Sequence, residues 1–418
     1  MVYVLNINGE PLMPTERHGK VKHLLTTGKA VVVKKSPFTI KLTYEVKNYT
    51  QKITLGIDAG SKTIGVSAST EAKELFAAEV AIRNDVVELL STRHENRRTR
   101  RNQLRYRKPR FLNRAKSKKE GWLAPSIKTK IHAHEKIISM IYGLLPISNL
   151  IVEVASFDIQ KIKNPDITGS EYQEGDQLGF WNVREYVLWR DGHICQGRKG
   201  CKNKILNVHH IESRKTGGDS PDNLITLCEQ CHKDYHEGKL KLNFKRGVSF
   251  RDAAFMGIMR WALFNKLKQK YSNTSYTYGY ITKNTRIANK LNKSHRIDAL
   301  CIAGHPEAEQ LKELFFIKQI RKHNRQIHKA NYLKGHKKKL NQMPYEQLGF
   351  RLFDKVKFKN HECFITGRRS SGYFMLKTLD GTTIHNSAKY KELKLIQKTN
   401  TFIFERRTGV SSPTYATA

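Results

Sequence analysis

Short runs of alternating apolar and polar positions fill the first part of the chain. From residue 1 to about 50, Gly9, Pro11, Pro14 and Pro37 separate these runs, a pattern that predicts a small strand-rich module. A second group of strands is predicted to begin with 53–58, which ends on the carboxylate of Asp58, and the next run follows directly. Together these strands favour a meander.

In the middle of the chain, the spacing of apolar residues changes from that of a helix to that of a strand. We predict a helix over 127–145 and a buried strand over 150–154 that ends near Glu153. Gly, Pro and Asp residues between 163 and 179 then indicate a linker. A Cys- and His-rich stretch follows that linker.

The last part of the chain combines helices and strands. We predict a helix over 253–270, a strand over 276–282 and a helix that carries His295 and Asp298. The tail over 350–404 alternates like a small β-barrel. No apolar run approaches the ~20 residues of a membrane span. We therefore expect no membrane partner. The first residues contain no basic region followed by an apolar one, so we also expect no signal peptide.

The electrostatic charge of the chain narrows its possible partners. The chain has 76 Lys and Arg against 37 Asp and Glu, a formal net charge of +39. Such a charge repels itself unless a polyanion neutralises it, so nucleic acid is the leading expectation. On bulk charge alone, an anionic membrane surface or a ribosome-like structural role stays open.

Basic residues gather in two segments. Between 91 and 119 there are thirteen Lys or Arg and one acid, Glu95, and a helix would align Arg97, Arg101 and Arg105 until Pro109 ends it. A second basic segment covers 316–340. For the first segment a solvated charged face is the alternative, but an excess of twelve positive charges in 29 residues is costly unless a partner neutralises it. The arginines that we expect to bind nucleic acid are Arg93, Arg97, Arg98, Arg100, Arg101, Arg105, Arg107, Arg110, Arg114, Arg321 and Arg325.

Four cysteines have the spacing of a metal site. Cys195 and Cys201 form a C-x5-C pair, and Cys228 and Cys231 form a C-x2-C pair, which predicts a tetrahedral structural Zn²⁺ site. The first pair is looser than the usual C-x2-C. Four unrelated buried thiols are the alternative. This spacing suits a reducing cytoplasm better than a disulfide scaffold.

Histidines and one asparagine lie among these cysteines in an ordered pattern. His209 and His210 form a doublet, Asn223 follows, and His232 and His236 lie one helical turn apart. This order resembles the HNH (ββα-metal) nucleases. The resemblance implies that His209 and His232 bind a catalytic metal ion, that His210 is the general base and that Asn223 orients it; His236 is a possible third ligand.

Acidic residues in three distant segments form a second candidate site. Asp58 and Glu153 end predicted strands, and His295 and Asp298 share one helix face. Each acid alone is more often a cap or a turn residue. Together they resemble the RuvC/RNase H arrangement, which implies that Asp58, Glu153 and Asp298 bind two Mg²⁺ ions about 4 Å apart and that His295 assists.

The order of these features along the chain resembles the IscB family, the transposon-associated relatives of CRISPR type II effector nucleases. Residues 9–14, Gly-Glu-Pro-Leu-Met-Pro, match the motif of that family's first domain. The resemblance implies an RNA-guided endonuclease with a guide (omega) RNA and a double-stranded DNA target. It further implies that the HNH site cuts the guide-paired strand, that the RuvC-like site cuts the displaced strand, and that Mg²⁺ serves both.

The fold class that follows is an α/β multidomain protein. We expect an RNase H-like (RuvC) core with an inserted ββα-metal HNH module, and a monomeric protein within a prokaryotic cytoplasmic ribonucleoprotein. The expected regions are 1–50 (N-terminal PLMP domain), 51–90, 121–165 and 251–315 (RuvC-like parts), 91–120 (Arg-rich bridge helix), 166–250 (HNH module with zinc knuckle), 316–345 (basic RNA-binding segment) and 346–418 (β-rich C-terminal domain contacting guide RNA or the target-flanking motif).

Two other functions remain open on the sequence. A guide-free HNH endonuclease of a mobile element needs only the central module, and it would cut DNA without RNA. A catalytically inactive RNA- or DNA-binding protein would bind RNA tightly and show no Mg²⁺-dependent nicking. The acidic set and the Arg-rich segment argue against the first, and the presence of both candidate sites argues against the second.

Overall fold

The chain forms two compact units. The computed structural model describes residues 1–104, 122–154, 182–198, 200–212, 221–242, 251–321 and 344–408. One unit combines Met1–Ser156 with Ile258–Ala418, and the other is Phe157–Gly257, which is inserted between the two parts of the first. The predicted linker over 163–179 lies outside the described residues. None of the described helices is long and apolar enough to cross a membrane.

The N-terminal module is a small sheet with one helix. Strands β1 (Tyr3–Leu5), β3 (Phe38–Leu42) and β2 (Ala30–Lys35) pair in that order, with β1 parallel to β3. Helix α1 (His18–Thr26) contributes Val21 to their shared core. The sequence predicted the strands here but not the helix, although Val21, Leu24 and Leu25 have the i, i+3, i+4 spacing of a helix face.

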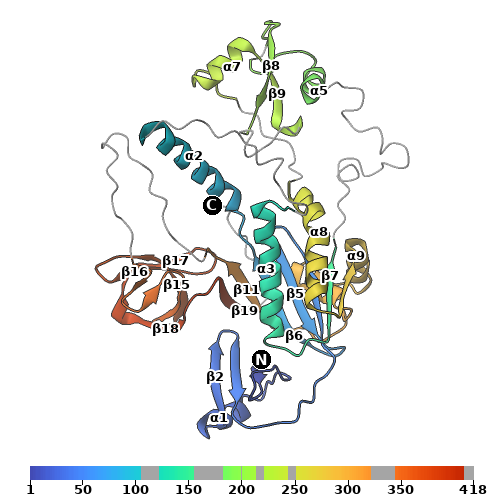
Figure 1. The fold of residues 1–418 in the computed structure, drawn as a ribbon, viewed down its shortest axis with the longest axis vertical. Helices are drawn as coiled ribbons and strands as arrows, with labels where there is room; N and C mark the ends of the chain where they lie inside the picture. Colours follow the sequence, from blue (N-terminus) through green and yellow to red (C-terminus); the bar gives the residue numbers. More distant parts are fainter. Residues whose placement is uncertain are drawn as a thin grey trace. The chain divides into compact units, whose positions relative to one another are not determined.

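A seven-stranded mixed sheet forms the core of the larger unit (Figure 1). Its strands are, in order of pairing, β10 (Thr274–Thr277), β7 (Asn149–Glu153), β4 (Thr54–Asp58), β5 (Thr63–Ser69), β6 (Glu74–Ala81), β11 (Glu313–Gln319) and β19 (Phe402–Thr408). The strands β4, β5 and β6 form the antiparallel meander that the sequence predicted. On the other side of β4, both β7 and β10 run parallel to their neighbours. The neighbours β4 and β7 therefore end at the same edge.

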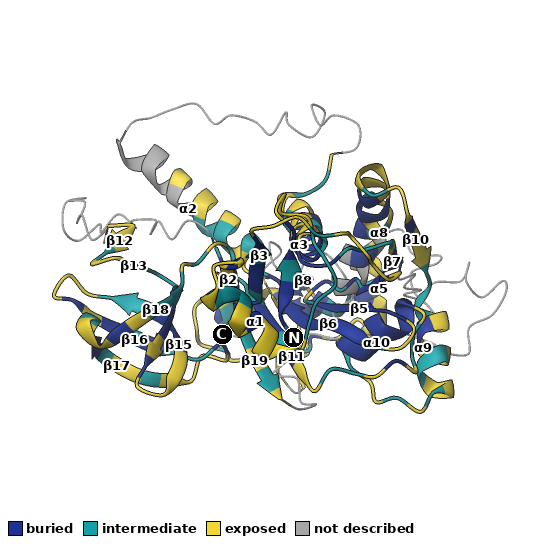
Figure 2. Ribbon diagram, turned by 90° about the horizontal axis from the view of Figure 1, so that it is seen from below, coloured by how far each residue is buried: buried dark blue, intermediate teal, exposed yellow. Residues whose placement is uncertain are grey.

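Helices cover both faces of this sheet. Helices α3 (Pro125–Tyr142) and α8 (Arg251–Lys270) lie on one face, and α10 (His295–Ile302) lies on the other, where buried residues of the sheet meet it (Figures 1 and 2). An ion pair of 2.9 Å between Lys266 and Glu135 joins α8 to α3. The other described helices of this unit are α2 (Val86–Leu104) and α9 (Gly279–Ala288).

Two glycines allow α10 to approach the sheet closely. A Cβ atom added at Gly56 of β4 would lie 2.0 Å from the Ala299 carbonyl oxygen, and one added at Gly65 of β5 would lie 1.9 Å from that of His295. Any side chain at these positions would push the helix away. Glycine here therefore determines how near the first turn of α10 lies to the end of β4.

Three expectations from the sequence differ from the structure. The strand predicted over 276–282 ends at Thr277, because Tyr278 is the N-cap residue of α9. The basic segment expected from 316 begins inside β11, a central strand that pairs with β6. The last strand of the expected C-terminal domain, β19, pairs with β11 in the same central sheet.

The C-terminal region forms an antiparallel five-stranded sheet rather than the predicted barrel. Strands β17 (Thr383–Lys389), β16 (Tyr373–Lys377), β15 (His361–Arg368), β14 (Lys355–Phe358) and β18 (Leu393–Gln397) pair in that order, so β17 and β18 are its two edges. A short pair, β12 (Glu346–Gln347) and β13 (Phe350–Arg351), precedes it, and a 3-10 helix occupies Tyr390–Glu392. Phe364 and Leu379 pack with Phe316 and Ile403 of the central sheet, which joins the two sheets.

The described part of the inserted unit centres on one strand pair flanked by two helices. Strands β8 (Leu206–His210) and β9 (Leu224–Cys228) are antiparallel, α5 (Val183–Arg190) precedes them and α7 (Glu229–His236) follows directly. A 3-10 helix at Pro221–Asn223 leads into β9. Its core contains Leu227 together with three buried cysteines. The order from β8 onward is therefore β, β, α.

We predict that Gly56→Ala destabilises the larger unit by about 3 kcal/mol, because the added methyl group overlaps backbone atoms that cannot move aside. The measurement is the midpoint of urea unfolding. Gly19→Ala in α1 is the matched control, since a Cβ atom there meets nothing within 4 Å. Equal unfolding midpoints for the two variants would contradict the packing argument.

Candidate metal centres

Three histidines of the inserted unit meet at one point. His209 comes from β8, and His232 and His236 lie four residues apart on α7, so they share a helix face. One ring nitrogen from each lies within 4.8 Å of the others. The ring centroid of His209 lies 5.0 Å from the ring centroid of His232 and 5.3 Å from that of His236. This is a spacing that one divalent cation can bridge.

The protonation states of these imidazoles favour metal binding. Burial, and then the neighbouring His232, His236 and His210, lower the pKa of His209 to about 4. Burial and His236 also lower the pKa of His232. His209 Nε2 is buried and has no hydrogen-bond partner among the described residues. A neutral ring with a buried, unsatisfied nitrogen fits a metal ligand, because coordination would satisfy that atom.

Asn223 fixes the chain that follows His210. It is fully buried; its Oδ1 accepts a hydrogen bond of 2.8 Å from the Glu212 N–H, and its Nδ2 donates one of 2.9 Å to the Glu212 carbonyl oxygen. Its own carbonyl oxygen accepts from the Ile211 N–H at 2.8 Å. These bonds hold the two residues after His210, so Asn223 acts on that histidine through the backbone.

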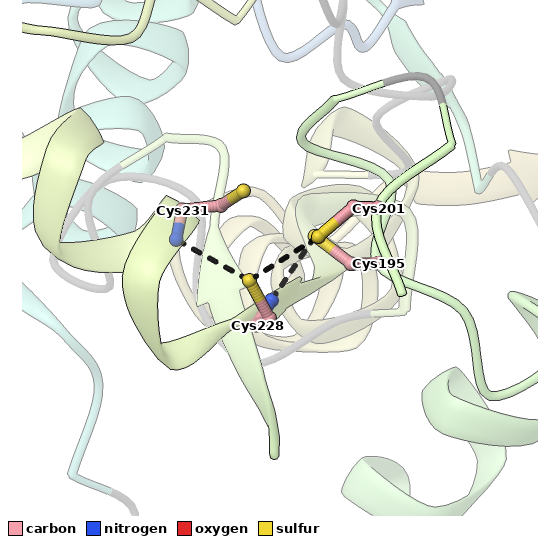
Figure 3. A group of neighbouring side chains, drawn as sticks. All are labelled: Cys195, Cys201, Cys228 and Cys231. Atoms are coloured by element: carbon pink, nitrogen blue, oxygen red, sulfur yellow. Dashed lines mark hydrogen bonds between the residues drawn. The ribbon is translucent and has the colours of Figure 1, made fainter. Parts of the chain in front are cut away.

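The four predicted cysteines also lie together, beside the same helix (Figure 3). Their sulfur atoms all lie within 4.8 Å of one another, and all four are free thiols. Backbone N–H groups of Cys228 and Gly197 donate to Cys195 Sγ at 3.1 and 3.4 Å, which stabilises a thiolate. A Cβ atom at Gly197 would lie 2.9 Å from that of Cys231, so the loop closes around the sulfurs only with glycine there. The donor set fits a tetrahedral zinc ion.

The acidic residues of the second candidate site converge in the larger unit. Asp58 and Glu153 end the parallel neighbours β4 and β7, and α10 brings His295 and Asp298 to the same edge. His295 Nδ1 lies 2.6 Å from Asp58 Oδ2. Arg286 of α9 lies 2.9 Å from Asp298, and Thr282 Oγ1 donates to Glu153 Oε2 at 2.8 Å.

The pKa values of these groups reflect their mutual repulsion and burial. Burial, and then the charge of Asp58, raise the pKa of Glu153 to about 7. The same two causes raise the pKa of Asp298. The contact with Asp58 raises the pKa of His295. Carboxylates that repel one another in a partly buried place are stabilised by a cation, so the chemistry of this set fits a divalent metal ion.

Each of the three carboxylates is bound to another side chain of the protein. Among the described residues, the groups whose ligand atoms all lie within 4.8 Å are the cysteine and histidine clusters, and the three acids do not form a third. The reason is that each acid faces its own partner: His295, Thr282 or Arg286. Metal binding here would require the contacts of His295 and Arg286 to be exchanged for contacts with the ion.

Three residues near the acids were not singled out from the sequence. Thr282 and Arg286 escaped notice because 276–282 was predicted as a strand, whereas α9 presents both on one helical face. Lys130 of α3 is buried; its Nζ donates to the Ser61 carbonyl oxygen and, at 3.1 Å, to Asn84 Oδ1. The sequence signal for Lys130 was its position on the apolar face of a predicted helix. Through its bond to Ser61, Lys130 holds the loop that follows Asp58.

The expected nucleic-acid-binding arginines are only partly described. Arg93 and Arg97 are exposed on α2, which extends to Leu104, and Arg321 is half-buried just after β11. Arg98, Arg100 and Arg101 lie in α2, and residues 97–101 have the sequence Arg-Arg-Thr-Arg-Arg. The remaining ones, Arg105, Arg107, Arg110, Arg114 and Arg325, lie outside the described residues.

Two family models match the chain. The family described as "RRXRR protein" matches residues 2–175, and the family "HNH endonuclease" matches residues 195–238. The second match contains the histidine cluster and the cysteine cluster, so the chain carries an HNH nuclease domain. The resemblance to IscB-type nucleases that the sequence motifs indicated is confirmed by these two regions.

Individual relatives match different shares of the chain. The protein "Anaredoxin" of Nostoc sp. strain PCC 7120 is 40% identical over 45 residues, which are 10% of this chain and 59% of that protein. Streptococcus thermophilus Cas9 in complex with the AGAA PAM is 15% identical with a TM-score of 0.33, over 50% of this chain and 30% of that one. The Type II-C Cas9 of Actinomyces naeslundii is 10% identical with a TM-score of 0.26, over 61% and 60%. The chain thus spans less than two thirds of each.

We predict that Asn223→Ala destabilises the inserted unit by about 1–3 kcal/mol, because it leaves the N–H and C=O of Glu212 without their partners. The measurement is hydrogen–deuterium exchange over 206–212, which we expect to become faster. Asn203→Ala is the matched control: Asn203 accepts one exposed hydrogen bond, from the Ile205 N–H, and its loss should matter less. Unchanged exchange in the Asn223 variant would refute the positioning role.

Proposed function

We propose that this chain is an RNA-guided DNA endonuclease of the IscB type, with two cleavage sites that use different ligands. The observation that carries the proposal is the order of the two family matches: an RRXRR region over 2–175 is followed by an HNH domain over 195–238. The net charge of +39 supports a polyanionic partner. The partners that we propose are a guide (omega) RNA and double-stranded DNA.

The HNH site would cut the DNA strand that is paired with the guide. His209, His232 and His236 would hold one Mg²⁺ ion, which stabilises the negative charge that develops on the scissile phosphate. His210 would take a proton from the attacking water, since a neutral imidazole is the side chain most often used as a general base. Asn223 would keep His210 in place through its bonds to the next residues.

The acidic site would cut the displaced strand. Asp58, Glu153 and Asp298 would hold Mg²⁺, and their convergence from β4, β7 and α10 supports an RNase H-like (RuvC) core. An antiparallel meander extended by two parallel strands is consistent with that fold. His295, next to Asp58, would hold or move a proton at the attacking water or the leaving oxygen. Lys130 would position the loop after Asp58.

The cysteines would hold a structural zinc ion. Cys195, Cys201, Cys228 and Cys231 supply four sulfur ligands to a unit with a small apolar core, and a metal ion is a usual means of stabilising such a unit. Cys228 is also the N-cap residue of α7, and its Sγ accepts from the Cys231 N–H at 3.4 Å. Zinc would therefore fix the start of the helix that carries His232 and His236.

The Arg-rich helix would bind the guide RNA. Guanidinium groups are planar and bind phosphate through two parallel hydrogen bonds, so a run of arginines on α2 suits an RNA backbone. The basic segment after β11 would add to this contact, and the C-terminal sheet would contact the guide or the DNA next to the target. Guide pairing would then read the target sequence.

We predict that the two sites can be inactivated one at a time. The full-length protein with its co-purifying RNA, Mg²⁺ and a matched supercoiled plasmid should cut both strands. His210→Ala should leave a nick in the displaced strand and Asp58→Ala a nick in the guide-paired strand, each with at least a roughly 100-fold loss on the other strand. Strand-specific end-labelling measures this.

The double variant should bind target DNA without cutting it, and His132→Ala, an exposed histidine of α3, should cut like the wild type. Cleavage of both strands by Asp58→Ala would remove the acidic site from the proposal. Cleavage without RNA would indicate a guide-free endonuclease instead, and tight RNA binding without any Mg²⁺-dependent cleavage would indicate an inactive binding protein.

We predict one zinc ion per chain in the purified protein, measured by native mass spectrometry. Cys231→Ser should lose it and lower the unfolding temperature of the inserted unit, because a hydroxyl group is a poor zinc ligand. Cys363→Ala, which removes a buried thiol of the C-terminal sheet, should keep the zinc. Equal zinc content in both variants would argue against the cysteine site.

A further inference from the structure

Aromatic side chains form a continuous strip that ends at the acidic site. The strip consists of Trp261 and Phe264 of α8, Tyr276 of β10, Tyr278, and Tyr280 in the first turn of α9. Tyr276 packs edge-on against Trp261 at 5.5 Å and against Phe264 at 5.2 Å. Tyr278 continues from Tyr276 at 5.6 Å, and Tyr280 lies parallel to Tyr278 at 6.0 Å.

Much of this aromatic surface faces solvent. Tyr280 is 66% exposed, Tyr276 44% and Trp261 40%, whereas Phe264 beneath them is buried. Strand β10 is the edge of the central sheet, so no further strand covers the strip among the described residues. Rings that served only to fill the core would be buried like Phe264. The exposed faces are therefore available to a partner with flat, apolar groups.

The charge around the strip identifies that partner as an anion. From Ala253 to Ile297 the chain has nine Lys or Arg and no Asp or Glu. Three of the nine form ion pairs with acids elsewhere in the chain: Lys266, Arg286 and Arg296. Lys283 is exposed on α9, three residues after Tyr280 and hence on the same side of the helix. Arg260 precedes Trp261 on α8; its Nε is buried and has no hydrogen-bond partner within the described part of the chain. Stacking rings bordered by cations suit a single-stranded nucleic acid, which offers both bases and phosphates.

The position of the aromatic strip indicates which nucleic-acid strand it would bind. The peptide between Tyr278 and Tyr280 passes beside Glu153, since a Cβ atom at Gly279 would lie 3.0 Å from Glu153 Oε1. Thr282, in the same helical turn, donates to the other oxygen of Glu153. A nucleic-acid strand whose bases stack on these rings would have its sugar-phosphate backbone next to the carboxylates.

We propose that Trp261, Tyr276, Tyr278 and Tyr280 form a stacking platform for single-stranded DNA, which leads the displaced strand into the acidic site. The inference rests on the proposed function of that site. The rings act as positioning residues, because bases stack on the tyrosines while the exposed Lys283 contacts the phosphates. Because every base has a flat face, such binding tolerates any sequence, which a strand displaced by a programmable guide requires.

The test is the affinity of the full-length protein for a fluorescein-labelled oligo(dT) of about 20 residues, measured by anisotropy without added Mg²⁺. Tyr280→Ala should bind roughly tenfold more weakly, and Tyr280→Ala with Tyr276→Ala more weakly still, because each removes one stacking surface. Tyr280→Phe keeps the ring and should bind like the wild type. Tyr49→Ala, at a tyrosine that is 79% exposed in the N-terminal region, should also have no effect.

The outcomes separate this inference from the proposed function. Equal affinity of the wild type and Tyr280→Ala overturns the platform, even if the nicking assay supports two cleavage sites. A larger loss for oligo(rU) than for oligo(dT) would assign the strip to RNA and overturn it as well. Conversely, weakened oligo(dT) binding in a protein that never cuts the displaced strand keeps the platform and removes the acidic nuclease site.

Discussion

The acidic site depends on one close contact between a helix and two strands. Because Gly56 and Gly65 carry no side chain, α10 lies directly on β4 and β5, and its first turn reaches the end of β4. His295 then contacts Asp58, and Asp298 comes near enough to raise the pKa of Glu153. Residues that are more than two hundred positions apart thus share one electrostatic environment. A side chain at either glycine would push α10 away from β4 and β5 and so lengthen the contact between His295 and Asp58.

The two candidate sites are held in place by different means. The acids rest on a sheet of seven strands with apolar layers on both faces, and this large core supplies the rigidity. Among the described residues of the inserted unit, the buried core cluster is small, and three of its members are cysteines. Its histidines are positioned by a short strand pair, by one helix and by Asn223. A metal at the cysteines would therefore contribute to the geometry of the histidine site as well as to stability.

Residues near one another in the sequence were the easiest to interpret. The spacing of Cys and His between Cys195 and His236 indicated both clusters. All of these ligands lie within about forty residues of one another, so a local pattern is enough to reveal them. The meander over β4 to β6 followed from alternation and turn residues. By contrast, no local pattern indicates that β19 returns to pair with β11, and apolar alternation cannot distinguish an added central strand from one in a separate sheet. Thr282 and Arg286 were missed for a related reason: a run of tyrosines favours a strand, yet the chain turns into α9 after Tyr278.

The return of β19 to the central sheet has a consequence for protein engineering. Since β19 covers β11, whose other edge pairs with β6, deleting the C-terminal region would leave a long row of unpaired backbone amides and carbonyls along a largely apolar strand. A chain shortened in this way would be prone to aggregate. Keeping β19 closes that edge, and keeping Phe364 and Leu379 covers Phe316 and Ile403, against which they pack.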